Sequence, residues 1–202
     1  MKSKIVTAVL AIGVILIIGA ANAMTLLTQE QAFKEMFPNA DRIIPMTKAP
    51  ADAELAKIKA RLGGTLVHFQ KGSESGSVQE KLEFTFYVAY QKTQPVGVAV
   101  IEEQPGKWGP VTYIIMLDPS TAKVKNLAVM SYEEKRGRPI ARRNFLDQFL
   151  GKGTADALKV HKDIRAVSGA TISSEATCFA VRKATVLCEE LVAGSDRLAT
   201  VK

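Results

Sequence analysis

The sequence predicts an α+β domain in which an antiparallel sheet of about four or more strands is flanked by helices. Four runs rich in β-branched and aromatic residues follow one another in the middle of the chain, and segments with helical spacing lie on both sides of them. The 202 residues, of which 47% are hydrophobic and 23% charged, are enough to bury a core without metal clips. This composition excludes a disordered tail, a collagen-like fibre and a polytopic membrane protein.

The first 23 residues have the pattern of an export signal. Lys2 and Lys4 precede an uncharged, mostly apolar stretch over 5–18, and small residues dominate 19–23. This order of basic, apolar and small residues is typical of a signal peptide cleaved after Ala23. An uncleaved N-terminal anchor is the alternative, because a spanning helix needs about 20 apolar residues. In both cases we expect the rest of the chain to lie outside the cytoplasmic membrane, in the periplasm or on the outer membrane face.

Residues 24–82 are expected to form an N-terminal extension of the same domain. Thr28 and Gln31 have the spacing of a capping box, which predicts a short helix that ends before Pro38. The other expected elements of the extension are a strand over 42–46, a helix over 51–62 and a loop over 72–76.

The second part of the chain, 83–202, carries the predicted sheet. Its four strands are expected over 84–90, 96–101, 111–117 and 124–130. We expect a helix over 140–150, a break over 151–153 and a long terminal helix over about 173–192. The apolar positions of that last helix share one side, and only Lys183 and Glu190 interrupt them. Packing of this side on the sheet would hold the first turn of the helix rigidly.

The two cysteines and the two histidines predict neither a disulfide nor a metal site. Cys178 and Cys188 lie ten positions apart in one expected helix, which separates them by about 15 Å, far beyond the reach of a disulfide. His68 and His161 lack the spacing of metal ligands. Cys188, to one side of the apolar stripe, is interpreted either as a partly buried residue or as a reactive thiol.

The segment Ser168–Ser174 immediately precedes the long terminal helix and reads SGATISS. Its small residues let another molecule approach the backbone, and Gly169 permits a dihedral angle that other residues avoid. The free N–H groups of a first helical turn favour an anion such as phosphate. The simpler interpretation is that Thr171 or Ser173 only caps the helix and Gly169 only makes a turn.

The sequence Ser168-Gly169-Ala170-Thr171, followed by a hydrophobe and two serines, resembles the flavinylation motif of the FMN-binding domain family. This family includes the FMN-carrying subunits of the sodium-pumping NADH:quinone reductase and of the Rnf electron-transport complexes. In the family, a transferase moves FMN from FAD to the threonine hydroxyl, which leaves a phosphoester link. The resemblance implies that Thr171 is the attachment residue, and that the neighbouring FMN-binding residues are Ser168, Gly169, Ala170, Ser173 and Ser174.

The resemblance extends over 83–192 and includes a second motif. The stretch 132–137, YEEKRG, is similar to the Tyr-Arg-Glu-Ser-x-Gly stretch of single-domain exported members of the family, which implies FMN-binding roles for Tyr132, Glu134, Arg136 and Gly137. The stretches 106–117, 145–152 and 162–167 are similar as well. Arg165 stands where many members have an acidic residue, and Asp163 is expected to substitute for it.

A basic run, formed by Lys135, Arg136, Arg138, Arg142 and Arg143, follows the second motif. It is interpreted as a solvated face, as a positive charge that stabilises reduced flavin or the phosphodiester, or as a docking surface for an acidic redox partner or the membrane. Nucleic acid is not expected as a partner of an exported protein. The aromatic residues Trp108 and Tyr132 are expected in the sheet core.

These features together predict an exported FMN-binding flavoprotein, covalently flavinylated on Thr171, that carries electrons outside the cytoplasmic membrane. The expected partners are the FMN transferase that uses FAD and redox proteins at or near the membrane. No catalytic constellation of side chains is visible in the sequence, which favours a carrier over an independent enzyme. The alternatives are an exported flavin-dependent reductase with a specific small-molecule acceptor and a flavin-free binding domain.

Overall fold

The computed structural model describes residues 24–73, 78–133, 138–193 and 198. In chain order the elements are β1 (Met24–Thr25), α1 (Gln29–Met36), β2 (Arg42–Lys48), α2 (Asp52–Arg61), β3 (Phe84–Gln91), β4 (Gln94–Pro105), β5 (Pro110–Leu117), β6 (Val124–Tyr132), η1 (Arg138–Ala141), α3 (Arg143–Leu146), η2 (Asp147–Phe149) and α4 (Thr171–Leu191).

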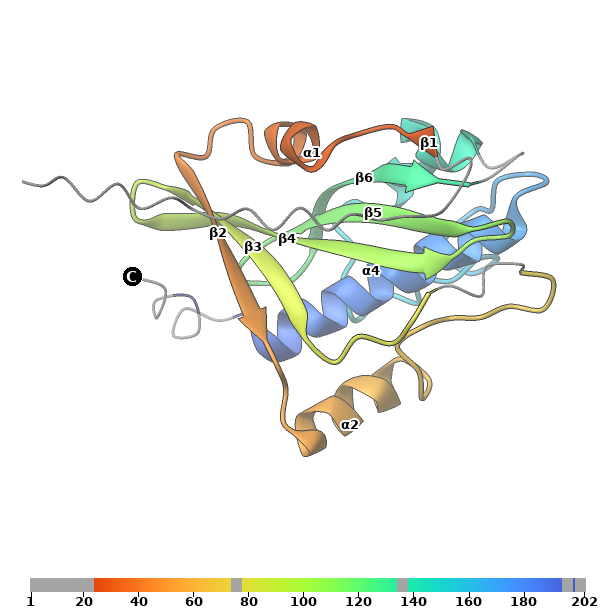
Figure 1. Cartoon of the computed structure of the whole chain (residues 1–202), viewed down its shortest axis with the longest axis horizontal. Helices are drawn as coiled ribbons and strands as arrows, with labels where there is room; N and C mark the ends of the chain where they lie inside the picture. Colours follow the sequence, from red (N-terminus) through yellow and green to blue (C-terminus); the bar gives the residue numbers. More distant parts are fainter. Residues whose placement is uncertain (1–23, 74–77, 134–137, 194–197, 199–202) are drawn as a thin grey trace, which may run out of the picture.

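The six strands form one sheet in the order β1-β6-β5-β4-β3-β2, and every neighbouring pair is antiparallel. Helices lie on both faces of this sheet (Figure 1). The predicted α+β class is therefore confirmed. The strand β1, which the sequence did not predict, has only two residues and pairs with the end of β6.

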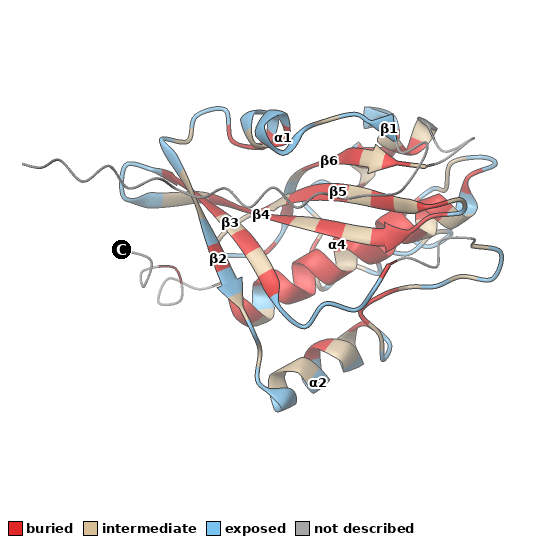
Figure 2. Cartoon of the chain, viewed as in Figure 1, coloured by how far each residue is buried: buried red, intermediate tan, exposed pale blue. Residues whose placement is uncertain are grey.

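The sheet separates two apolar clusters of different size. The larger cluster lies between the sheet and α4 and includes Val98 and Val100 of β4. The smaller cluster lies on the other face, where α1 contributes Ala32 and Met36 and β4 contributes Ala99. Successive residues of a strand point to opposite faces, so β4 supplies both layers. Figure 2 shows α4 buried along most of its length, which fixes its position against the sheet.

The expected capping box at the start of α1 is confirmed. The hydroxyl of Thr28 accepts the backbone N–H of Gln31 at 3.3 Å, and the Gln31 side chain accepts the backbone N–H of Thr28 at 2.9 Å. Both helix-end donors are thereby satisfied. The predicted strands and the second helix appear as β2 to β6 and α2, with ends that differ from the expected ones by a few residues.

The expected single helix over 140–150 is wrong. The structure has three short turns there, η1, α3 and η2, of four, four and three residues. Pro139 has no backbone N–H to donate, and Arg142 is extended, with φ −80° and ψ 144°. The resulting bends direct Ile140, Phe145 and Phe149 into the larger cluster. The chain therefore buries these side chains along a curved path, and it does not form one straight helix with a single apolar side.

The helix α4 begins two residues earlier than expected, and the two charged residues that interrupt its apolar side both have ion-pair partners. The Lys183 side chain is paired with Glu102 of β4, and Glu190 is paired with Lys57 and Arg61 of α2. Cys178 and Cys188 lie in this one helix, as expected, and both are free and buried. The helix is thus enclosed by the sheet on one side and α2 on another.

Within the described residues, no helix is both long enough and apolar enough to cross a membrane. The expected export segment, 1–23, lies outside them.

Candidate functional site at the start of α4

Segments that are distant in sequence meet at the first turn of α4. The Gln70 side chain donates a hydrogen bond of 3.1 Å from Nε2 to the carbonyl oxygen of Ile172. Nearby in sequence, the Ser73 hydroxyl donates to the carbonyl oxygen of Gly106, in the turn between β4 and β5. The N-terminal extension therefore contributes to the surroundings of the SGAT motif, which the sequence did not indicate.

The motif forms a tight turn immediately before the helix. The N–H of Ala170 donates to the carbonyl of Val167 at 3.0 Å. Gly169 has a φ of +74°, and a side-chain carbon added there would meet nothing within 4 Å. The glycine is thus favoured by its left-handed backbone and not by a close neighbour. Ala170, with φ −134°, is the N-cap of α4.

Thr171 is the first residue of α4 and is exposed. No side chain caps this helix end, so the interpretation of Thr171 or Ser173 as the N-cap is wrong. The Thr171 hydroxyl has no hydrogen-bond partner among the described residues. A reaction at this oxygen would therefore not remove a bond that holds the fold together.

The two serines of the motif's second half lie below the surface. Ser174 is fully buried, and its hydroxyl donates to the carbonyl of Ala170 at 2.9 Å and accepts the N–H of Val167 at 3.0 Å. Ser173 is 1% exposed. Ser168 and Gly169, in contrast, are exposed beside Thr171. The Ser174 hydroxyl thus braces the turn from inside and connects both of its ends to the helix.

A cavity of about 520 Å³ opens beside the motif and carries two arginines. Arg142, Arg165 and Ser168 are among the residues that line it. The Gln148 side chain accepts the N–H of Arg165 at 2.8 Å and donates to the carbonyl oxygen of the same residue at 3.2 Å, so the backbone of Arg165 is held on both sides. The departure from the family pattern at this position therefore adds a positive charge to a cavity that Ser168 also lines.

Other members of the basic run have different surroundings. Arg143 is paired with Asp147 and donates to the carbonyl of Leu127 at 3.0 Å, which connects α3 to β6. This agrees with a structural, solvated role for Arg143. Three other expected site residues, Glu134, Arg136 and Gly137, lie outside the described residues, as does Lys135 of the basic run.

Asp163 is part of a different turn. Its carboxylate accepts the N–H groups of Leu158 and Lys159 at 3.0 and 2.9 Å and pairs with Lys152 at 3.2 Å. Burial acts to raise the pKa of Asp163, but these donors outweigh it and hold the pKa below its usual value. This geometry favours bracing of the 158–163 turn, and a contact with the cofactor stays a prediction.

The two aromatic residues near the site behave differently. Tyr132, at the end of β6, is 4% exposed and belongs to the larger apolar cluster, as expected. Trp108 is half-buried, so its expected burial in the sheet core is wrong. It lies in the turn between β4 and β5, and Lys107 Nζ lies 4.9 Å from the centroid of the Trp108 ring.

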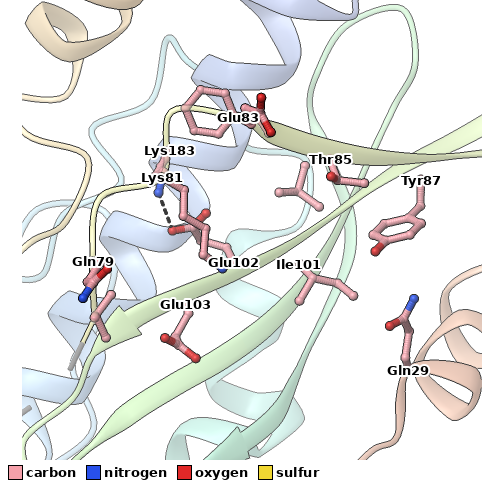
Figure 3. Close-up of a pocket in the computed structure, with 13 residues that line it drawn as sticks. Gln29, Gln79, Lys81, Glu83, Thr85, Tyr87, Ile101, Glu102, Glu103 and Lys183 are labelled. Carbon is pink, nitrogen blue, oxygen red and sulfur yellow. Dashed lines mark hydrogen bonds and ion pairs between the residues drawn. The ribbon is translucent and has the colours of Figure 1, made fainter. Parts of the chain in front are cut away.

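A second cavity, of about 460 Å³, lies further along α4 and is drawn in Figure 3. Its lining includes the ion pair between Lys183 and Glu102, whose charged atoms are 2.7 Å apart. Lys183 follows Thr171 by twelve residues, which is about 18 Å along the helix. This cavity is therefore separate from the motif.

The fold and the motif together define a small α+β domain with an exposed threonine hydroxyl at the start of a long helix and two arginines in a cavity beside the preceding Ser168. Residues 106–186 match the family described as FMN-binding domain. This match confirms that this part of the chain resembles that family, and it includes the SGAT motif with Thr171.

Comparisons with curated protein sequences and with solved structures give two further findings. No curated protein sequence matches the chain. Among solved structures, the chain is similar to NqrC of Shewanella oneidensis, with 16% sequence identity and a TM-score of 0.46 over 74% of this chain and 80% of that one.

Proposed function

We propose that this protein is an exported flavoprotein that holds FMN through a phosphoester on Thr171 and transfers electrons outside the cytoplasmic membrane. One observation carries the proposal. An exposed threonine hydroxyl, without a hydrogen-bond partner among the described residues, follows Ser168 by three positions in a segment that matches the FMN-binding domain, and Ser168 lines a cavity together with Arg142 and Arg165.

The chemistry of the position suits a phosphate group. The first N–H groups of α4 have no acceptor within the helix, and the partial positive charge of a helix N-terminus favours an anion. The guanidinium groups of Arg142 and Arg165 add charge and donors on the cavity side. Both contributions favour the negative phosphodiester that a flavin attached at Thr171 would carry.

The attachment is a group transfer with a simple balance. The Thr171 oxygen would form a bond to the phosphorus of the FMN half of FAD, the bond between the two phosphates would break, and AMP would leave. The hydroxyl proton would be lost to the transferase or to water. We infer an FMN transferase as partner because the resemblance to the FMN-binding domain family implies this route of attachment.

Electron transfer belongs to the flavin, and the chain supplies position and electrostatics. Ser174 and Gln70 hold the backbone on either side of Thr171, so the attachment point would be rigid. The two arginines would stabilise the extra negative charge of reduced flavin. An acidic redox partner at or near the membrane fits the same surface, because charge complementarity speeds docking.

Export explains why the flavin would be attached covalently. A flavin that dissociated outside the cytoplasmic membrane would be lost, whereas a phosphoester removes that equilibrium. This part of the proposal rests on the basic, apolar and small-residue order of the first 23 residues.

The proposal is tested by intact-mass analysis of protein made in a host that has an FMN transferase. The wild-type chain is expected to gain the mass of FMN less water, on a peptide that contains Thr171. Thr171→Val, which keeps the shape but lacks the hydroxyl, should not gain it, and Thr171→Ser should retain a fraction. An unmodified wild-type chain, or a modified Thr171→Val chain, would overturn the assignment.

A further inference from the structure

A third cavity, of about 380 Å³, lies between α4, the end of α2 and the 158–160 segment. From α4 it is lined by Glu175, Cys178, Phe179 and Arg182. Its volume is within the range of pockets that hold small molecules. Neither the motif nor the proposed flavin chemistry uses it.

Arg182 is a half-buried cation without an ion-pair partner among the described residues, although Glu175 lines the other end of the same cavity. No carboxylate of the described residues lies within ion-pair distance of its guanidinium group, whereas the neighbouring charged residues Lys183, Glu189 and Glu190 all have partners. The Nε atom of Arg182 is buried and has no acceptor in the described structure. Burying an unpaired charge or donor is costly, so an anionic ligand at this position would supply the missing acceptors.

The cavity also offers an apolar, flat surface beside the cation. The ring of His68 stacks on the ring of Phe179, with centroids 5.1 Å apart and an angle of 13° between the planes. The Arg182 guanidinium carbon lies 5.4 Å from the centroid of the same Phe179 ring. Leu62, Leu158 and Val160 complete the apolar lining. An anion with a flat, apolar body would contact both the charge and this surface.

The two charged residues that α4 contributes are at opposite ends of the cavity. Glu175 and Arg182 are seven residues apart, which is about 10 Å along the helix. Lys159 lines the cavity as a second cation, also without an ion-pair partner among the described residues. On the side of the cavity that α4 forms, Arg182 is therefore the positive end, and a carboxylate would be repelled from the Glu175 end.

We propose that this cavity binds a small planar organic carboxylate, with the carboxylate on Arg182 and the flat body against Phe179 and His68. Arg182 presents parallel N–H donors, which match the two oxygens of a carboxylate. The inference does not depend on flavin attachment.

Benzoate is the probe, and the full chain is titrated with it by calorimetry and by NMR of backbone and arginine N–H groups. Saturable binding is expected, with shifts at Phe179, Arg182 and the 158–160 segment. Benzamide, which has the same ring without the charge, and acetate, which lacks the ring, should each bind at least about tenfold more weakly.

Arg182→Gln should weaken benzoate binding by about tenfold or more, since a charge-assisted pair is lost. Arg42→Gln is the matched control, because the Arg42 guanidinium also lies over an aromatic ring, 5.0 Å from the Tyr90 centroid, but is not part of the lining of this cavity. Arg182→Lys keeps the charge and should retain part of the affinity if the variant Arg182→Gln loses it for electrostatic reasons. The proposal is overturned if benzoate shows no saturable binding, if benzamide binds as well as benzoate, or if Arg182→Gln binds like the wild type.

Discussion

Lys183 of α4 and Glu102 of β4 form an ion pair inside the protein, with 2.7 Å between Nζ and Oε1 and side chains that are 5% and 8% exposed. The Gln104 side chain donates to the same Glu102 oxygen at 2.7 Å and to the carbonyl oxygen of Leu66 at 3.2 Å. The pair is therefore the centre of a network that connects the helix, the sheet and the 65–68 segment.

Lys183→Met is expected to lower the free energy of unfolding by about 3–5 kcal/mol at neutral pH, because it leaves a buried carboxylate unpaired. Lys183→Met combined with Glu102→Leu should recover most of the loss, since no buried charge is left. Urea denaturation of the two single variants and the double variant measures this coupling. Single effects that simply add would contradict it.

The loss of stability caused by Lys183→Met should depend on pH, and its direction follows from the pKa of Glu102. Burial raises the pKa of Glu102, although the Lys183 charge opposes this. Without Lys183 the pKa rises further, so the folded state takes up a proton that the unfolded state lacks. Stability is then retained at low pH and lost as pH rises through the folded-state pKa. We expect Lys183→Met to be closer to the wild type at pH 5 than at pH 8.

This pair also illustrates what the sequence can and cannot predict. The helical spacing identified Lys183 as an interruption of an apolar stripe, whereas the expected strand over 96–101 ended one residue before Glu102. Their contact joins residues 81 positions apart, and no local pattern specifies such a distant pairing. The strands, the long helix and the SGAT turn follow from local periodicity and small-residue chemistry, which is why they were predictable.

The surroundings of the motif were less predictable for the same reason. Gln70 contacts Ile172 across 102 positions of sequence, and the backbone of Arg165, which lines the motif cavity, is held by Gln148 across 17 positions. The helix expected over 140–150 failed because apolar spacing alone does not reveal where a chain must bend to bury its side chains.

Ser174→Ala should loosen the turn that presents Thr171. The substitution removes the acceptor of the Val167 N–H and a donor to the Ala170 carbonyl. Loss of a buried hydrogen bond of this kind costs about 1–3 kcal/mol, and the yield of covalent flavin should fall with it. The measurements are chemical denaturation and intact mass after expression with the transferase.

Thr47→Ala is the control for this prediction, because the Thr47 hydroxyl makes an exposed hydrogen bond of 3.0 Å to Thr85 away from the motif. It should change the free energy of unfolding by no more than about 0.5 kcal/mol, and it should leave the flavin yield unchanged. Equal flavin yields in Ser174→Ala and the wild type would show that the bracing does not matter for attachment.

Neutralising the two arginines of the motif cavity should lower the reduction potential of the bound flavin. Arg142 and Arg165 are exposed, so each contributes only about 0.2–1 kcal/mol, which is about 5–20 mV for a two-electron couple. The combination of Arg142→Gln and Arg165→Gln should therefore shift the potential down by about 10–40 mV at low salt. Spectroelectrochemical titration measures the shift.

Salt provides an internal check on this electrostatic argument. Exposed charges are screened beyond about 3 Å at 1 M ionic strength, so the difference between the double variant and the wild type should shrink there. Arg42→Gln, far along the sheet at the start of β2, should leave the potential unchanged. A double variant with the wild-type potential at low salt would exclude the arginines as stabilisers of reduced flavin.

The native protein should be inert to thiol reagents, in contrast to the interpretation of Cys188 as a reactive thiol. Cys178 is 4% and Cys188 is 0% exposed, and burial is the main cause that raises the pKa of each thiol to about 12. At pH 8 only about one thiol in 10,000 would then be the reactive thiolate. Alkylation with iodoacetamide, followed by intact mass, should add nothing to the folded chain and two groups after unfolding in urea.

Because both cysteines lie on α4, their protection also reports on the helix that carries Thr171. A variant such as Ser174→Ala, which loosens only the motif turn, should keep both thiols protected. Lys183→Met weakens the contact between helix and sheet and should therefore expose the thiols faster. Rapid alkylation of the wild-type protein would mean that α4 separates from the sheet in the native state.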